Sequence, residues 1–80
     1  MGNNLALALL DLTQAGASLL IKSSLEPHQE VELELYSSGY PKHIRVPGSV
    51  VWSVAAQEGA YCIGVRFDRY LAYADLQRLT

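Results

Sequence analysis

The chain has little of what most enzymes and metal sites are built from. Its eighty residues include one cysteine, Cys62, and two histidines. A single cysteine cannot form an internal disulfide, and two scattered histidines without acidic company do not make a metal site. The sequence also has no Ser/His/Asp or Cys/His set and no phosphate loop. We therefore expect no enzymatic activity, no cofactor and no metal, and the reducing cytoplasm is the expected compartment.

Basic residues and long apolar runs are also scarce. Six Lys and Arg residues against eight Asp and Glu residues give a formal net charge of −2, whereas nucleic-acid-binding domains usually carry a strongly basic face. The longest purely apolar run extends only from Leu5 to Leu10, far short of the roughly 20 residues that span a bilayer. We expect no binding of DNA or RNA, no membrane insertion and no export.

Two segments of the chain alternate apolar and polar residues in the way that is typical of a β-strand. Residues 29–36, QEVELELY, place three apolar residues on one side and three glutamates on the other, and residues 60–67, AYCIGVRF, alternate in the same way. A period of two with one polar face is typical of a half-buried strand beside water. Half of the composition is apolar, so residues 1–80 are expected to form a single compact domain.

The segment between these two strands is also β-like but is interrupted. Residues 44–55 return to β-branched and aromatic residues, and Pro47-Gly48 breaks the run because proline lacks an amide to donate. The chain is here either one bent strand or two short ones. Trp52 is expected in the core, since small domains need their large aromatic residues, and the alternative is a face of the barrel where a base could stack. Glu58-Gly59 predicts a hairpin turn into the last strand.

The final segment changes to a helical period. Asp68 is a suitable N-cap, and Ala72, Tyr73, Leu76 and Leu79 fall on one stripe, which predicts a helix of about three turns. The first twenty residues are ambiguous. Ala and Leu favour a helix over residues 5–15 that stops at Gly16, whereas the alternation of apolar residues on both sides of DLTQAG favours a strand, a turn and a second strand.

Several pieces taken together resemble a PilZ domain over residues 5–80. These are DLTQAG at residues 11–16, where the family carries a D/N-x-S-x-x-G turn, then VELEL, VVW and IGVRF in the family's order. The resemblance implies a mainly β fold, a small antiparallel split β-barrel of six strands with a C-terminal α-helix. It also favours the strand, turn and strand interpretation of the first twenty residues.

The resemblance implies a non-catalytic bacterial receptor module for the second messenger cyclic di-GMP. Asp11, Thr13 and Gly16 match the acidic, hydroxyl and glycine positions of the turn motif and are the expected ligand-binding residues. An ionised aspartate can accept two hydrogen bonds from the Watson–Crick edge of guanine. Arg66, on the polar face of its strand, is the candidate contact for a ligand phosphate.

One element of the family pattern is missing from these eighty residues. PilZ receptors carry an R-x-x-x-R segment before the turn that clamps the phosphates, and no Arg or Lys precedes Asp11 here. The domain is therefore expected to be N-terminally short, with nucleotide binding that is weak or lost. The alternative function is a protein-interaction adaptor on the same barrel. Tyr70, Tyr73 and Leu76 are then candidates for the surface that meets a partner protein, an attached effector domain or a second copy of the chain.

Overall fold

The computed structural model describes residues 6–37 and 40–79, which form five β-strands and one α-helix. The cluster of turn formers at residues 36–41 predicts a turn, and residues 38–39 of it lie outside the described residues. The strands are β1 (Ala6–Leu12), β2 (Gly16–Ile21), β3 (Glu30–Ser37), β4 (Tyr40–Ala55) and β5 (Tyr61–Phe67), followed by α1 (Tyr73–Leu79). The mainly β fold predicted from the sequence is confirmed.

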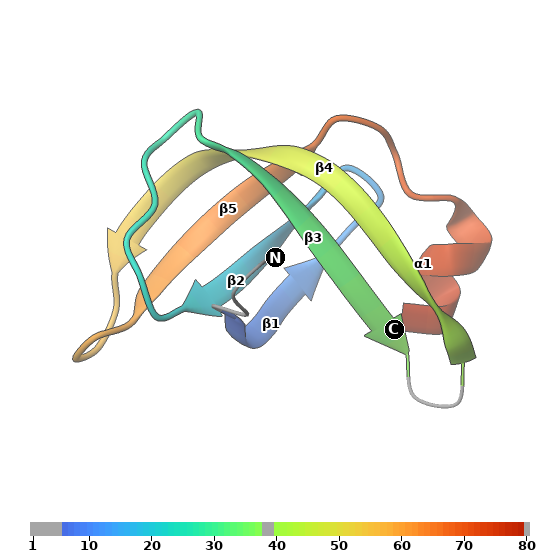
Figure 1. The fold of residues 1–80 in the computed structure, drawn as a ribbon, viewed down its shortest axis with the longest axis horizontal. Coiled ribbons are helices and arrows are strands. Elements are labelled where there is room, and N and C mark those ends of the chain that lie inside the picture. The colour runs from blue at the N-terminus through green and yellow to red at the C-terminus, as the bar shows by residue number, and fades with distance from the viewer. Residues whose placement is uncertain (1–5, 38–39, 80) are drawn as a thin grey trace.

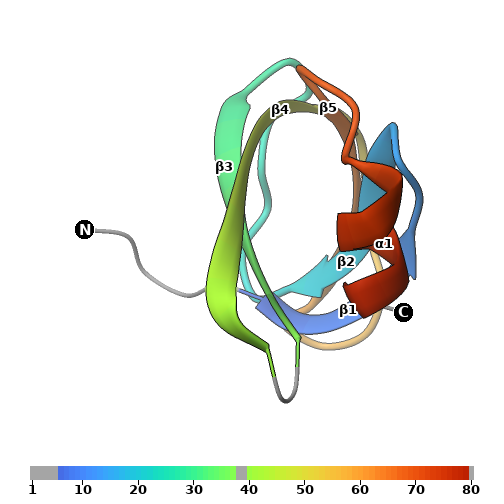
Figure 2. The same cartoon turned by 90° about the vertical axis from the view of Figure 1, so that its right-hand side faces the viewer.

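The strands form one antiparallel sheet in the order β1-β2-β5-β4-β3. The sheet curls into a half-barrel, and α1 lies at one end of it against β3 (Figure 1). Figure 2 shows the strands curving around a common centre with α1 at the near end. No helix in residues 6–37 and 40–79 is long and apolar enough to cross a membrane.

The core lies on the concave face of this sheet. It is built from the inward positions of β2, β4 and β5, which alternate with outward positions as a period of two requires. The buried apolar residues are Ala17, Leu19, Ile21, Leu35, Val46, Val50, Ile63, Val65, Phe67 and Leu71. The glutamates of β3 face outward and are exposed, so the half-buried strand predicted from QEVELELY is confirmed.

β4 is a single bent strand, which settles the alternative that Pro47-Gly48 left open. Its first part pairs with β3 as far as Ser49, and its second part pairs with β5 from Gly48 onward. The strand therefore changes partner at the Pro47-Gly48 step. Because β4 continues unbroken, the described residues contain five strands, rather than the six that the resemblance implied.

The predicted position of Trp52 is wrong, and a β-bulge explains why. Val50 pairs with Val65 on the inner face, so strict alternation would turn Trp52 inward as well. The register shifts between Val50 and Trp52, and Trp52 pairs instead with Gly64. One extra residue on one strand moves the following side chains to the opposite face. Trp52 therefore lies on the outer face and keeps 43% of its surface exposed.

The helix is shorter than predicted and begins later. α1 has seven residues and starts at Tyr73, so Asp68 is not its N-cap. The reason is tertiary. The backbone N–H of Asp68 donates to Pro47 O at 2.8 Å, and that of Leu71 donates to Gln14 O at 2.9 Å. These bonds, and the burial of the Leu71 side chain, hold the preceding segment in an extended path along the sheet.

Candidate functional site

The DLTQAG segment is a turn between two strands, as the alternation on both sides favoured. β1 ends at Leu12 and β2 begins at Gly16, with the backbone N–H of Thr13 donating to Gly16 O at 2.9 Å. Asp11 precedes the turn and pairs with Ser18 on β2. Ser18 in turn pairs with Gly64 on the outer face, which places the Asp11 carboxylate on the convex, solvent side of the sheet.

The hydroxyl of Thr13 holds the turn together. It accepts hydrogen bonds from the backbone N–H groups of Ala15 and Gly16, both at 3.2 Å, and lies 3.3 Å from Gly16 O, to which it donates. A hydroxyl has one donor and two acceptor sites, so these three contacts use its full capacity. Thr13 therefore shapes the turn, and a direct contact to a ligand requires one of these bonds to open.

Gly16 is required by the packing of two strands. A Cβ at this position would collide with the carbonyl oxygen of Val65 on β5. Because that atom belongs to the backbone of a neighbouring strand, it cannot move aside without separating β2 from β5. The glycine of the motif thus fixes how closely the turn sits against the sheet.

An open pocket of about 210 Å³ brings the motif residues together on the outer face. It extends from the turn across β2 and β5 to β4. Its lining residues are Asp11, Thr13, Gly16, Ala17, Ser18, Val51, Trp52, Gly64 and Val65. Three of the four residues proposed from the sequence line it. The sequence analysis expected Trp52 in the core, with an outer face of the barrel as the alternative, and it assigned no role to Gly64. The signal for them was a glycine on the outer face of IGVRF, since strand glycines often mark a close approach by another group.

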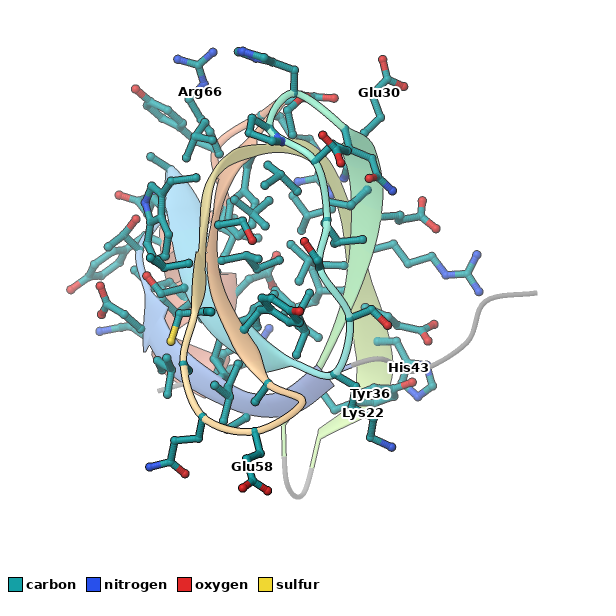
Figure 3. All side chains as sticks on the ribbon, turned by 90° about the vertical axis from the view of Figure 1, so that its left-hand side faces the viewer. Lys22, Glu30, Tyr36, His43, Glu58 and Arg66 are labelled. Carbon is teal, nitrogen blue, oxygen red and sulfur yellow. The ribbon has the colours of Figure 1, made fainter. Side chains whose placement is uncertain are left out.

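Arg66 stands beside this pocket and does not line it. It pairs with Gly16 on β2 and with Ser49 on β4, and its side chain is exposed. Figure 3 shows Arg66 and Glu30 pointing away from the barrel at the same end of the molecule. Arg66 follows Val65, which lines the pocket, and it pairs with Gly16 of the motif. A cation therefore lies next to the pocket.

The pocket has acceptor groups and an aromatic wall, and Asp11 is the one carboxylate among its lining residues. No set of three or more His, Cys, Asp or Glu that could hold a metal ion occurs among the described residues. At about 210 Å³ the pocket is smaller than the roughly 300–1,000 Å³ of most small-molecule sites. Its size and chemistry fit one planar ring system with hydrogen-bond donors along its edge.

Comparisons with curated proteins and with solved structures gave no match. The PilZ domain family matches residues 2–80, which is almost the whole chain and includes the turn, the pocket and α1. The chain therefore belongs to the PilZ domain family.

Proposed function

We propose that this chain is a non-catalytic module that takes one guanine of cyclic di-GMP into the outer-face pocket and passes the signal to a protein partner or an attached domain in the bacterial cytoplasm. The observation that carries the proposal is the pocket itself, which joins Asp11, Thr13 and Gly16 of the family's turn motif on one exposed surface. PilZ domains are typically receptor modules of the cyclic di-GMP type rather than catalysts.

Asp11 is the residue that reads the base. Its carboxylate is exposed at the end of β1 and lines the pocket. An ionised carboxylate only accepts hydrogen bonds, and the Watson–Crick edge of guanine presents N–H donors side by side. Adenine presents a ring nitrogen acceptor at the corresponding place, so the same carboxylate disfavours adenine. Gly16 keeps the turn close to the sheet, and Arg66 lies on the neighbouring row, where it can approach a phosphate.

Binding by these eighty residues is weak. No Arg or Lys precedes Asp11, so the two guanidinium contacts that the R-x-x-x-R segment supplies in the family are missing. A charge-assisted contact is worth roughly 1.5–3 kcal/mol, and the loss of two corresponds to about a hundredfold to ten-thousandfold in affinity. The net charge of −2 gives no long-range attraction for a dianion. Arg66 offers one guanidinium group near the pocket, where the R-x-x-x-R segment of the family offers two.

Calorimetric titration of the chain with cyclic di-GMP at modest salt tests the proposal. We expect heat from a complex with a dissociation constant between about 10 μM and 1 mM. Asp11→Ala removes the carboxylate that would accept the hydrogen bonds from the base, and it should weaken binding roughly tenfold or more. Asp68→Ala is the matched control, because Asp68 is exposed and does not line the pocket; its affinity should stay unchanged.

Two results would count against the proposal. Equal affinity in Asp11→Ala and Asp68→Ala would show that the base is not read at this turn. No heat at about 1 mM ligand would exclude sensing by this chain and favour the adaptor function. The exposed aromatic residues Tyr70 and Tyr73, with 75% and 63% of their surfaces accessible, are the observation that supports the adaptor function. They lie on α1 and just before it, where a partner could contact them.

A further inference from the structure

β3 is an edge strand of the sheet, and its outer edge has no hydrogen-bonding partner among the described residues. It stands last in the strand order and pairs with β4 alone. An unpaired edge presents a row of backbone N–H and C=O groups, which is a template for another strand. The pairing with β4 runs without a shift from Glu30 to Leu35, so this edge is regular over most of its length.

The opposite edge of the sheet, β1, is irregular. Its pairing with β2 shifts between Ala6 and Ala8 and again between Leu9 and Asp11. Bulges of this kind twist an edge strand and discourage a further strand from pairing with it. β3 is therefore the edge of this sheet that can accept a partner strand.

The hydrogen bonds of β4 show which backbone groups of β3 face the free edge. Opposite residues in an antiparallel pair alternate between pairs that exchange hydrogen bonds and pairs that do not. Glu32 lies opposite Pro47, which has no N–H and whose carbonyl accepts from the backbone N–H of Asp68 at 2.8 Å. Pro47 thus bonds away from β3. The N–H and C=O groups of Glu32 are therefore directed to the free edge.

The same holds two residues further along β3. Glu34 lies opposite Arg45, whose carbonyl accepts from Nη2 of Arg69 at 2.8 Å and so also points away from β3. The alternation adds Glu30. The free edge therefore carries the backbone N–H and C=O groups of three glutamates.

These glutamates also place carboxylates along the edge. Their side chains are exposed, at intervals of roughly 7 Å along the strand, and Figure 3 shows Glu30 pointing away from the barrel. Glu34 is already contacted by Arg45 and His43. Glu30 and Glu32 have no ion pair within the described part of the chain, and the residues opposite them on β4 are uncharged.

We propose that the free edge of β3 binds an extended segment of a partner protein in which lysine or arginine occupies every second position, paired antiparallel with β3. Each basic residue then lies directly opposite a glutamate, on the same face of the sheet. Its backbone N–H donates to the glutamate carbonyl, and its side chain meets a carboxylate. A second copy of β3 in this place would set glutamate against glutamate, which is destabilising.

This inference does not depend on nucleotide binding, because no residue of β3 lines the pocket. The probe is a capped peptide of alternating lysine and threonine, KTKTKTK. In the proposed pairing its lysine amides face β3 and its threonine amides face solvent. By calorimetry at modest salt, KTKTKTK and a form with N-methylated threonines should bind the chain with dissociation constants between about 50 μM and 1 mM. A form with equally many N-methylated lysines should bind roughly tenfold more weakly or worse.

Amide hydrogen exchange on the chain shows where the peptide lies. In the free chain the amides of Glu30, Glu32 and Glu34 should exchange fast, whereas those of Val31 and Leu33 are directed to β4. At about ten times the dissociation constant, KTKTKTK should slow exchange of the glutamate amides up to about tenfold. Attraction between charges alone does not protect a backbone amide.

The double variant Glu30→Gln/Glu32→Gln removes two carboxylates and leaves the backbone edge intact. It should weaken binding of KTKTKTK about twofold to 30-fold. Glu26→Gln/Glu58→Gln is the matched control, because it changes the net charge equally at exposed residues outside β3. Its affinity should stay close to that of the wild type. Circular dichroism shows whether each variant is folded.

Several results would overturn the proposal. Equal binding of the two methylated peptides, or unchanged exchange of the glutamate amides in the complex, would exclude strand pairing. Equal affinity of the two double variants would show that the carboxylates do not select the peptide. No heat at about 1 mM KTKTKTK would exclude the site. Protection of the glutamate amides that rises with chain concentration, without peptide, would assign the edge to a second copy of the chain.

Discussion

Three side chains of β3 and β4 contact the Glu34 carboxylate on the outer face of the sheet. The Tyr36 hydroxyl donates to its Oε1 at 2.7 Å, Arg45 Nε donates to its Oε2 at 3.2 Å, and His43 Nδ1 lies 3.4 Å from the same oxygen. The Tyr36 and His43 rings also meet edge to face, with centroids 4.2 Å apart. The hydrogen bond from Tyr36 is the main cause that lowers the pKa of Glu34; desolvation opposes it as the next largest effect, and Arg45 and His43 each lower the pKa by less.

Removal of the Tyr36 hydroxyl should raise the pKa of Glu34 toward its ordinary value. A carboxyl whose pKa is lowered by folding stabilises the fold above its ordinary pKa, and this contribution is lost as the pH falls through the folded-state pKa. Tyr36→Phe should therefore reduce the loss of stability on acidification. Carbon-13 NMR titration of the Glu34 carboxyl measures the pKa directly. Tyr70→Phe is the control, and an identical Glu34 titration in both variants would show that the phenol does not set the pKa.

The individual residues of the candidate site could be predicted from the sequence only in part. Asp11, Thr13 and Gly16 could be named together because they match the family's turn motif, whereas helix propensity alone left a helix over residues 5–15 open. Trp52 could not be placed, because its face depends on the bulge at Val51, and no local signal fixes where an extra residue enters a strand. The use of the Thr13 hydroxyl by its own turn was likewise visible only in the structure.

Backbone hydrogen bonds join the DLTQAG turn to the end of β5 and to the segment before α1. Phe67 N–H donates to Ala15 O at 2.8 Å, and Leu71 N–H donates to Gln14 O at 2.9 Å. The Gln14 side chain completes the set, with Nε2 donating to Leu71 O at 2.8 Å. Leu71 is buried in the core, so the contact is anchored on the α1 side. A displacement of the motif turn is thereby coupled to the start of the helix.

Gln14→Ala should loosen α1 although Gln14 lies outside the helix. The variant loses the side-chain bond to Leu71 O, and a typical hydrogen bond contributes about 0.5–1.5 kcal/mol to the free energy of unfolding. Amide hydrogen exchange over residues 73–79 should become faster, while exchange in β5 should change little. Gln57→Ala, in the exposed turn between β4 and β5, is the matched control. Equal exchange in α1 of both variants would contradict the coupling.

The strands were predicted better than the helix, for a physical reason. β2, β3 and β5 have a strict alternation that one buried face enforces, and all three are confirmed. The helix was predicted too long, because the segment has adequate helix propensity, but Asp68 and Leu71 donate their backbone N–H groups to the distant carbonyls of Pro47 and Gln14. Propensity describes a segment alone, and tertiary hydrogen bonds of this kind override it.

β4 joins β3 to the other strands of the sheet. Its first part pairs with β3 and its second part pairs with β5. On its other edge β5 pairs with β2, and β2 pairs with β1. The sequence showed that Pro47-Gly48 disturbs the strand. It could not show whether the strand ends there, because that depends on which strands are available as partners on each side. The two halves of the half-barrel therefore share one continuous backbone, and their stabilities should be linked.

Gly48 is where this linkage can be tested. A Cβ at Gly48 would lie 2.6 Å from Arg66 O and 2.9 Å from Val65 Cγ1. The carbonyl belongs to the backbone of β5, so Gly48→Ala must push β4 and β5 apart, and overpacking of this kind costs typically 1–3 kcal/mol. Because β4 belongs to both halves, amide exchange should become faster in β3 and in β2 by similar factors. Urea unfolding followed by circular dichroism and by Trp52 fluorescence should give one coincident transition at lower urea.

Gly59→Asn is the matched control for Gly48→Ala. Gly59 has φ +69° in the turn after β4, with open space around it, and asparagine tolerates that conformation better than other side chains do. The control should lower stability only slightly and should leave exchange in β3 unchanged. If Gly48→Ala accelerated exchange in β5 and β2 but not in β3, the two halves would be independent units, and β4 would be a connection rather than the shared support of the sheet.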